Sequence, residues 1–299
     1  MVTDDKRRAF AELYPFQSRT LSLDSLRYHY LDEGQGDAVL MLHGNPTWSF
    51  YYRNLILGLR EQCRCVAPDH MGCGLSDKPQ QYDYTLARHV DNLEALVEHL
   101  GLTGLTLVLH DWGGAIGMGY AVRHPGRVKR LVLFNTAAFL SREIPWSINL
   151  CRLPLFGPLA VRGLNAFAGL AVSRACRRPM SPQVKAGYLF PYDTYANRVA
   201  ILRFVQDIPM SRKTPSFPLV KSMQEQLTQF ADRPVLILWG KKDFCFNDHY
   251  LERWLEYFPQ AELHEFADAG HYVVEDAHER IVPLMQKFFD NHPLNHTDG

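Results

Sequence analysis

The 299-residue sequence has no long apolar run free of charge, no excess of one charge, and few cysteines. A helix that spans a bilayer needs about 20 consecutive apolar residues, and no such stretch is present. Lys and Arg together number 32, as do Asp and Glu, so the chain has no net charge to attract nucleic acid or an acidic polymer. We therefore expect no membrane span and no nucleic-acid partner.

The cysteines include no Cys-x-x-Cys pair, and no histidine cluster has the spacing of metal ligands. We interpret them as free thiols in a reducing compartment. The six are Cys63, Cys65, Cys73, Cys151, Cys176 and Cys245. The segment Met1–Arg8 carries charge and is not followed by the apolar region of a signal peptide. These features predict a cytoplasmic protein with no bound metal and no cofactor.

Apolar residues make up 46% of the chain and charged residues 21%, as in a globular protein with a large core. Strand-like and helix-like segments alternate along most of it. Strands are expected in 18–32 (two, around a turn at 24–25), 38–42, 65–68, 105–109, 128–134, 235–239 and 261–266, and helices in 48–59, 85–100, 115–121, 248–257 and 275–290. The predicted fold class is α/β, with one doubly wound, mostly parallel sheet.

The alternation stops after Asn135. Residues 136–228 contain nine prolines, many aromatic residues and leucines, and no pattern typical of a buried strand. We predict that residues 1–135 and 229–299 form the core and that 136–228 form a helical cap. Such a cap would cover the C-terminal edge of the sheet, where open α/β sheets bind ligands. The alternative is a helical subdomain that binds nothing.

Asp111 follows the strand expected at 105–109 and precedes a helix rich in glycine. This strand–turn–helix context is that of a nucleophile elbow, with Asp where many hydrolases carry Ser. The alternative is an Asp that only caps the helix. The segment resembles the nucleophile motif of Asp-dependent α/β-hydrolases, a group that includes haloalkane dehalogenases and epoxide hydrolases.

An Asp nucleophile needs a base that activates water and an acid that holds the base. In α/β-hydrolases these residues follow in the order nucleophile, acid, histidine. His271 lies in the loop after the last expected strand and is the candidate base. Asp243 follows the strand that ends at Trp239 and is the candidate acid, with Asp248 as second choice. The other place for an acid is occupied by Asn135, which carries no charge.

The loop His43-Gly44-Asn45-Pro46 follows the strand expected beside the nucleophile strand. The backbone N–H groups of Asn45 and Trp112 are predicted to form an oxyanion hole. The side chains of the same two residues can donate hydrogen bonds to a departing halide or carboxylate-like oxygen. Epoxide hydrolases usually have an aromatic residue in place of Asn45 and use two cap tyrosines instead.

With these residues, nearly the whole chain resembles the third subfamily of haloalkane dehalogenases. Asn135 disfavours the sister subfamily, which has a Glu at that place. Several segments look closer still to the β-lactone decarboxylases of bacterial long-chain olefin biosynthesis, which belong to the same subfamily. They are 43–49, 68–79, 135–139 and 203–209. One departure is Leu109, because elbows often prefer a small residue there.

The resemblance implies that Asp111 forms an alkyl ester with the substrate and that His271 then activates water to hydrolyse it. A haloalkane would yield halide and alcohol, and a β-lactone would yield an alkene and carbon dioxide. Epoxide hydrolysis is the alternative, for which the cap offers Tyr188, Tyr192 and Tyr195. A non-enzymatic interaction module is a further alternative, since α/β-hydrolase folds also serve as receptors.

The cap segment 145–172 is apolar and is followed by Arg174, Arg177 and Arg178. It either packs on the core, admits long alkyl chains, or docks on partner enzymes or a membrane. The expected ligands are a small hydrophobic substrate and a halide ion, and the expected partners are a second copy of the chain or enzymes of olefin biosynthesis. Candidate pocket residues are Phe139, Trp146, Phe167, Phe190 and Phe204.

Overall fold

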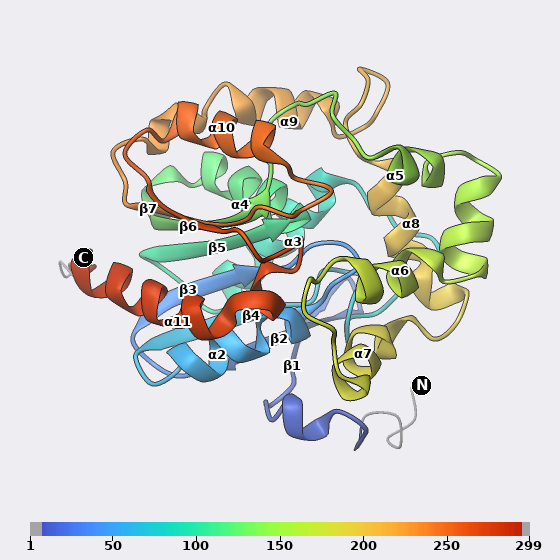
Figure 1. Ribbon diagram of the computed structural model, residues 1–299, viewed down its shortest axis with the longest axis horizontal. Coiled ribbons are helices and arrows are strands. Elements are labelled where there is room, and N and C mark those ends of the chain that lie inside the picture. Colours follow the sequence, from blue (N-terminus) through green and yellow to red (C-terminus); the bar gives the residue numbers. More distant parts are fainter. Residues whose placement is uncertain (1–7, 295–299) are drawn as a thin grey trace.

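The computed structural model describes residues 8–294. The signal-peptide prediction rests mainly on positions 1–7, which lie outside the described residues. An eight-stranded sheet runs through the centre of the molecule in the order β1-β2-β4-β3-β5-β6-β7-β8 (Figure 1). Its strands are β1 (Arg19–Leu23), β2 (Leu26–Glu33), β3 (Asp37–Leu42), β4 (Cys63–Pro68), β5 (Leu105–Asp111), β6 (Val128–Thr136), β7 (Val235–Gly240) and β8 (Glu262–Phe266).

Only the first two strands break the parallel arrangement. β1 pairs antiparallel with β2, and β2 pairs antiparallel with β4, while the other five neighbouring pairs are parallel. The hairpin between β1 and β2 turns at Asp24 and Ser25, both with positive φ, as the sequence predicted. The mostly parallel α/β sheet is therefore confirmed.

Both faces of the sheet are buried. In β3, Leu40 and Leu42 pack with α3 (Leu86–His99), α4 (Trp112–Arg123) and α10 (Asp248–Tyr257). Val39 and Met41 point to the opposite face and pack with α2 (Arg53–Leu59) and α11 (Val273–Asn291). Figure 1 shows these two helical layers above and below the sheet. Apolar side chains on both faces explain why the central strands read as uninterrupted hydrophobic runs.

Most expected elements occur, with shifted ends. The helix expected at 48–59 begins as a 3-10 helix, η2 (Ser49–Tyr52), and continues as α2. β6 extends to Thr136, so Asn135 lies inside the strand rather than after it. Two short 3-10 helices were not expected, η1 (Ala11–Leu13) and η3 (Pro125–Arg127).

The chain between β6 and β7 is helical, and no strand is present between residues 137 and 234. Most of these helices lie at one end of the sheet, but the helix at 217–224 packs beside α4 over one face of the sheet (Figure 1). The helices between β6 and β7 are α5 (Trp146–Cys151), the π-helix η4 (Pro158–Gly163), α6 (Ala166–Arg174), α7 (Pro182–Leu189), η5 (Phe190–Tyr192), η6 (Ala196–Arg198), α8 (Val199–Gln206), α9 (Phe217–Gln224) and η7 (Leu227–Phe230).

Within residues 8–294, no helix is both long enough and apolar enough to cross a bilayer.

Candidate active site

The turn between β5 and α4 places Asp111 at the C-terminal edge of the sheet. Asp111 has φ 50° and ψ −126°, a conformation that is costly for any residue but glycine. A Cβ at Gly113 would overlap the backbone of Leu42, so α4 can approach β3 this closely only with glycine there. Gly117 likewise leaves the space that the Leu109 side chain fills. The bulky residue at 109 is thus accommodated by a glycine in α4.

The two oxygens of the Asp111 carboxylate have different surroundings. Oδ1 accepts a 2.6 Å hydrogen bond from the backbone N–H of Asn45, and the backbone N–H of Trp112 also donates to the carboxylate. Oδ2 lies 3.7 Å from Nε2 of His271. Burial raises the pKa of Asp111, and His271 and the two N–H donors oppose that rise. The backbone N–H of Asn45 therefore fixes one oxygen, while the other faces the histidine.

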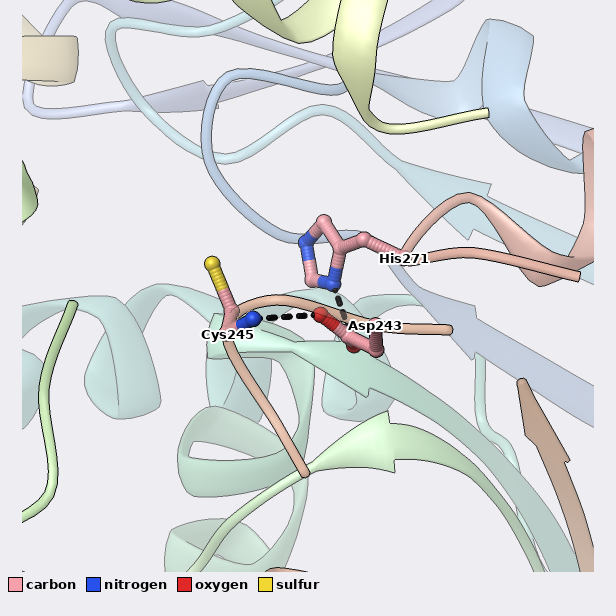
Figure 2. Close-up of side chains that lie close together, drawn as sticks. All are labelled: Asp243, Cys245 and His271. Carbon is pink, nitrogen blue, oxygen red and sulfur yellow. Dashed lines mark hydrogen bonds and ion pairs between the residues drawn. The ribbon is translucent and has the colours of Figure 1, made fainter. Parts of the chain in front are cut away.

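His271 lies between two carboxylates. Its Nδ1 is 2.8 Å from Oδ2 of Asp243, the contact drawn in Figure 2, and its Nε2 faces Asp111. Burial alone would lower the pKa of His271. The charge and hydrogen bond of Asp243, together with the charge of Asp111, outweigh burial and raise that pKa. With Nδ1–H donated to Asp243, Nε2 is the nitrogen that can accept a proton.

The loop after β7 fixes Asp243. Its Oδ1 accepts a 2.6 Å hydrogen bond from the backbone N–H of Cys245 (Figure 2). Asp243, Cys245 and His271 each offer one ligand atom within 4.8 Å of the others, a spacing that a metal ion could use. However, burial raises the pKa of the Cys245 thiol well above its usual value, and metals bind the thiolate. Both Asp243 oxygens are also already hydrogen-bonded, so the cluster fits an acid–histidine pair better than a metal site.

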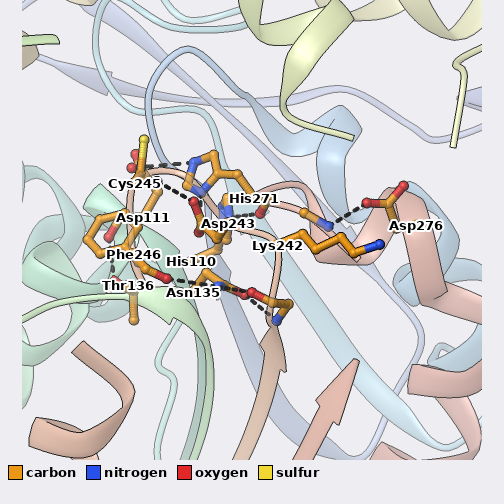
Figure 3. A network of polar contacts seen from close by, with 12 residues as sticks. His110, Asp111, Asn135, Thr136, Lys242, Asp243, Cys245, Phe246, His271 and Asp276 are labelled. Carbon is orange, nitrogen blue, oxygen red and sulfur yellow. Dashed lines mark hydrogen bonds and ion pairs between the residues drawn. The ribbon is translucent and has the colours of Figure 1, made fainter. Parts of the chain in front are cut away.

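The two other positions considered for the acid serve different purposes. Asn135, in β6, donates from Nδ2 to the carbonyl of Gly240 at 3.0 Å, and its Oδ1 accepts from the N–H of Gly240 at 2.8 Å. It thereby ties the end of β7 to β6, beneath the loop that carries Asp243 (Figure 3). The carboxylate of Asp248 pairs with Lys241 at 2.6 Å. Of the three positions considered for the acid, only Asp243 contacts His271.

A buried carboxylate that the sequence analysis missed joins the helical insertion to the His271 loop. Asp276 is completely buried and accepts the backbone N–H groups of Gly270, Arg177 and Arg178 at 2.8 to 2.9 Å. Figure 3 shows its contact with the loop. In addition, the carbonyl of Ala175 accepts the N–H of Tyr272 at 2.9 Å. The segment 175–178 therefore holds the loop from both sides of His271.

His110 was also missed, although it directly precedes Asp111 in the sequence. It is fully buried, and burial lowers its pKa well below the usual value, so the ring is neutral. Its Nε2 is 2.9 Å from the carbonyl oxygen of His271, a contact in the network of Figure 3. Strand β5 therefore positions both Asp111 and the backbone of the histidine opposite it.

The side chains of Asn45 and Trp112 differ in how free they are to donate. Nδ2 of Asn45 donates to the carbonyl of Ile201 in α8 at 3.1 Å, which commits one of its two hydrogens to the helical insertion. The Trp112 ring packs against Phe204 at 5.2 Å between centroids. In the described part of the chain, no acceptor takes its indole N–H. Both residues border the cavity above Asp111.

A largely apolar cavity of about 830 Å³ opens above Asp111 and His271. Its size is typical of sites for drug-sized ligands, roughly 300 to 1,000 Å³. Phe139, Trp146 and Phe167 border it. Phe190 and Phe204 do not, contrary to expectation: Phe190 packs against Phe10 at 5.0 Å, and Phe204 stacks on His89 at 4.5 Å. Both are drawn into the core because their helices pack directly on it.

The three tyrosines considered for epoxide chemistry face other partners, and none borders the cavity. The hydroxyl of Tyr188 donates to Glu275 at 2.6 Å, and that of Tyr192 donates to the carbonyl of Thr47 at 3.3 Å. Tyr195 is half exposed and lies beneath the guanidinium of Arg162. The pair of cap donors that epoxide opening requires is therefore not formed by these residues.

Comparison with known proteins gives concordant matches. A family model described as the alpha/beta hydrolase fold matches residues 37–277. The cis-3-alkyl-4-alkyloxetan-2-one decarboxylase of Shewanella oneidensis is 47% identical over 283 residues, covering 92% of this chain and 89% of that protein. Haloalkane dehalogenase 2 of Mycobacterium tuberculosis is 34% identical over 281 residues, covering 93% and 96%. The crystal structure of the haloalkane dehalogenase DatA from Agrobacterium tumefaciens superposes with a TM-score of 0.83 at 27% identity, covering 92% and 96%.

The Asp243→Asn substitution should lower the pKa of His271, because it removes the negative charge that raises it. Titration by ¹⁵N-histidine NMR measures this pKa, with the His271 signal identified by its absence from a His271→Gln variant. We expect a pKa raised above that of a free histidine side chain in the unaltered protein and a lower pKa in the variant. Equal values in the two proteins would show that Asp243 does not set the charge of His271.

The Asp276→Asn substitution should destabilise the fold by about 2 to 3 kcal/mol, because an amide group would then face buried N–H donors. Urea unfolding measures this change. Asp290→Asn is the matched control, since Asp290 lies on the same helix but is exposed. If both variants unfold at the same urea concentration, the contacts of Asp276 contribute nothing to stability.

Proposed function

This chain belongs to the α/β-hydrolase fold family, and we propose that it is a β-lactone decarboxylase that uses Asp111 as a nucleophile. One observation carries the proposal: a single carboxylate, with one oxygen held by the backbone N–H of Asn45 and the other facing His271, lies beneath a large apolar cavity. The higher identity to the decarboxylase, 47% against 34% for the dehalogenase, favours the lactone over a haloalkane.

In the first step, Oδ2 of Asp111 attacks the ring carbon bonded to the lactone oxygen. The carbon–oxygen bond breaks, and its electron pair stays on the departing carboxylate. Asp111 is then esterified, and Oδ1 becomes the ester carbonyl oxygen, still bound to the N–H of Asn45. We assign the remaining Nδ2 hydrogen of Asn45 and the indole N–H of Trp112 to the departing anion. Donors fixed in advance in this way lower barriers substantially.

In the second step, the released carboxylate leaves as carbon dioxide. The electrons of the broken carbon–carbon bond form the alkene double bond, and the Asp111 carboxylate is expelled. Atoms and charge balance without water, and the enzyme returns to its starting state. The products are one alkene and one carbon dioxide molecule.

Haloalkane dehalogenation is the second candidate function, favoured by the indole N–H of Trp112, which has no acceptor in the described part of the chain. A halide would take the place of the departing carboxylate. The alkyl ester has no carboxylate to lose, so it must be hydrolysed. His271, with its raised pKa and its bond to Asp243, is placed to deprotonate the water.

We propose that residues 136–228 act as the cap of this site and that the protein is cytoplasmic. Contacts of the insertion with Asn45 and with the His271 loop support the first assignment. All six cysteines lie in the described part of the chain and are free thiols, which supports the second. Epoxide hydrolysis loses its main support, because the cap tyrosines make other contacts.

The His271→Gln substitution separates the two reactions. With a 1-bromoalkane, the first step needs no base, so intact-protein mass spectrometry should show the added alkyl group while turnover falls by about 10² or more. With a long-chain cis-β-lactone, alkene release needs no water and should continue, as followed by gas chromatography.

His249→Gln is the matched control, since His249 is 39% exposed and lies outside the cavity. It should behave like the unaltered protein with both substrates. The ester scheme is wrong if the His271→Gln variant gains no mass on incubation with the bromoalkane. The water-free route is wrong if this variant loses alkene release as completely as it loses bromoalkane turnover.

The Trp112→Phe substitution should slow the first step by roughly 10² to 10³ and leave hydrolysis of a preformed ester unchanged, because it removes the indole donor but keeps an aromatic ring against Phe204. Rapid-quench measurement of bromide release isolates this step. A rate within twofold of that of the unaltered protein would exclude Trp112 as the leaving-group donor.

A further inference from the structure

The helical insertion carries a strong local excess of positive charge. Residues 144–192 contain six cationic side chains and no Asp or Glu, although the chain as a whole has no net charge. The six are Arg152, Arg162, Arg174, Arg177, Arg178 and Lys185. In the described part of the chain, only Arg178 has a carboxylate partner, Glu279 at 3.4 Å. This segment therefore carries a net positive charge, although the protein as a whole has none.

The same segment exposes most of the large apolar side chains on the molecule. Ten such side chains are exposed in the described chain, and six of them form what we call the cap patch. The cap patch consists of Trp146, Leu155, Phe156, Leu159, Leu164 and Leu170. Leu155 is 90% exposed, Trp146 80% and Leu164 72%, so these side chains make little contact with the protein. Exposed apolar groups gathered in this way mark an interaction surface.

The cap patch adjoins the mouth of the cavity above Asp111. Trp146, Phe156 and Leu170 are exposed and also border that cavity, as does Arg174. The patch lies on α5, η4, α6 and the turn between α5 and η4, and η4 contacts both of these helices. In Figure 1 α5 and α6 lie among the helices at the end of the molecule beyond the sheet. Whatever binds the cap patch therefore lies next to the opening through which a ligand reaches Asp111.

We propose that the cap patch docks on the surface of an anionic lipid bilayer. Apolar side chains with a tryptophan among them, flanked by Arg and Lys that mostly have no carboxylate partner, are the features of a surface that inserts shallowly into anionic lipid. Each cation near such a surface adds attraction to the negatively charged lipids. A second copy of the chain is a poorer occupant, because a twofold interface would bring two positively charged surfaces together.

Docking would set the cavity mouth against the apolar phase in which a long-chain substrate dissolves. The substrate would then pass from lipid to the cavity without crossing water. This inference is independent of the reaction at Asp111, because a haloalkane or a lactone with long alkyl chains partitions into lipid equally well. Its test uses lipid binding rather than catalysis.

The test is binding of the full-length protein to vesicles of phosphatidylcholine, with and without one quarter phosphatidylglycerol. We expect flotation with the anionic vesicles, weaker flotation with the neutral ones, and release by salt. Trp146 supplies a second readout, since Trp48, Trp239 and Trp254 are fully buried and Trp112 is partly buried against Phe204, beside Asp111. Its fluorescence should be quenched by lipids brominated along the acyl chain, and a Trp146→Phe variant should lack this quenching.

The Leu155→Ser/Leu164→Ser double variant removes two exposed side chains that do not border the cavity. We expect its partition into anionic vesicles to fall about tenfold or more. Its melting temperature and its activity on a short, water-soluble substrate should not change. Leu57→Ser is the control, because Leu57 is an exposed leucine on α2, away from the cap patch, and its loss should leave binding unchanged.

Three results would overturn the proposal. Two of them are equal binding of the double variant and the unaltered protein, and no binding of either to anionic vesicles. The other is an unaltered protein that forms oligomers by light scattering while the double variant is monomeric, because another copy of the chain would then cover the cap patch.

Discussion

The carboxylate of Asp111, of whose side chain only 12% is exposed, is the constraint on which the rest of the site depends. An ionised carboxylate away from water costs several kcal/mol unless hydrogen bonds and opposite charge compensate. Here the compensation comes from backbone N–H groups of residues 45 and 112 and from His271. Donors of this kind require the left-handed turn at Asp111 and the close approach of α4 to β3. The strained backbone at Asp111, the glycines of α4 and the position of the loop after β3 thus all help to place hydrogen-bond donors at this carboxylate.

The contact between Asp243 and His271 makes the position of the Asp111 site depend also on the C-terminal part of the chain. His271 stays opposite Asp111 because Asp243 bonds its ring and His110 bonds its backbone. Asp276 then connects the histidine loop to residues 177 and 178 of the helical insertion. A movement of that insertion would shift the histidine loop, so the shape of the cavity and the geometry of the reacting groups are coupled.

The proposed chemistry and the proposed surface favour the same kind of substrate. A water-free decarboxylation needs an apolar cavity that holds alkyl chains. It also needs hydrogen-bond donors for the departing anion, which we assign to the side chains of Asn45 and Trp112. The cap patch, with exposed leucines and nearby arginines that mostly have no carboxylate partner, would allow such chains to enter the cavity directly from lipid. In the proposed chemistry, His271 and Asp243 are required for any substrate whose ester must be hydrolysed.

The sequence by itself determined the fold class and identified the candidate residues of the site. Apolar runs of strand length, each followed by a polar or glycine-rich turn, specify a parallel sheet and the edge at which its loops gather. Because that edge is common to all the parallel strands, Asp111, Asp243 and His271 could be expected to meet there. The tertiary structure alone decided which side chains the cavity receives. Phe190 and Phe204 turn into the core, the Asn45 amide bonds α8, and Asp276 and His110 hold the histidine loop. These contacts join residues far apart in the chain, and their partners are mostly backbone atoms. A backbone N–H or carbonyl is the same at every position, so no sequence pattern records which one a side chain will bind.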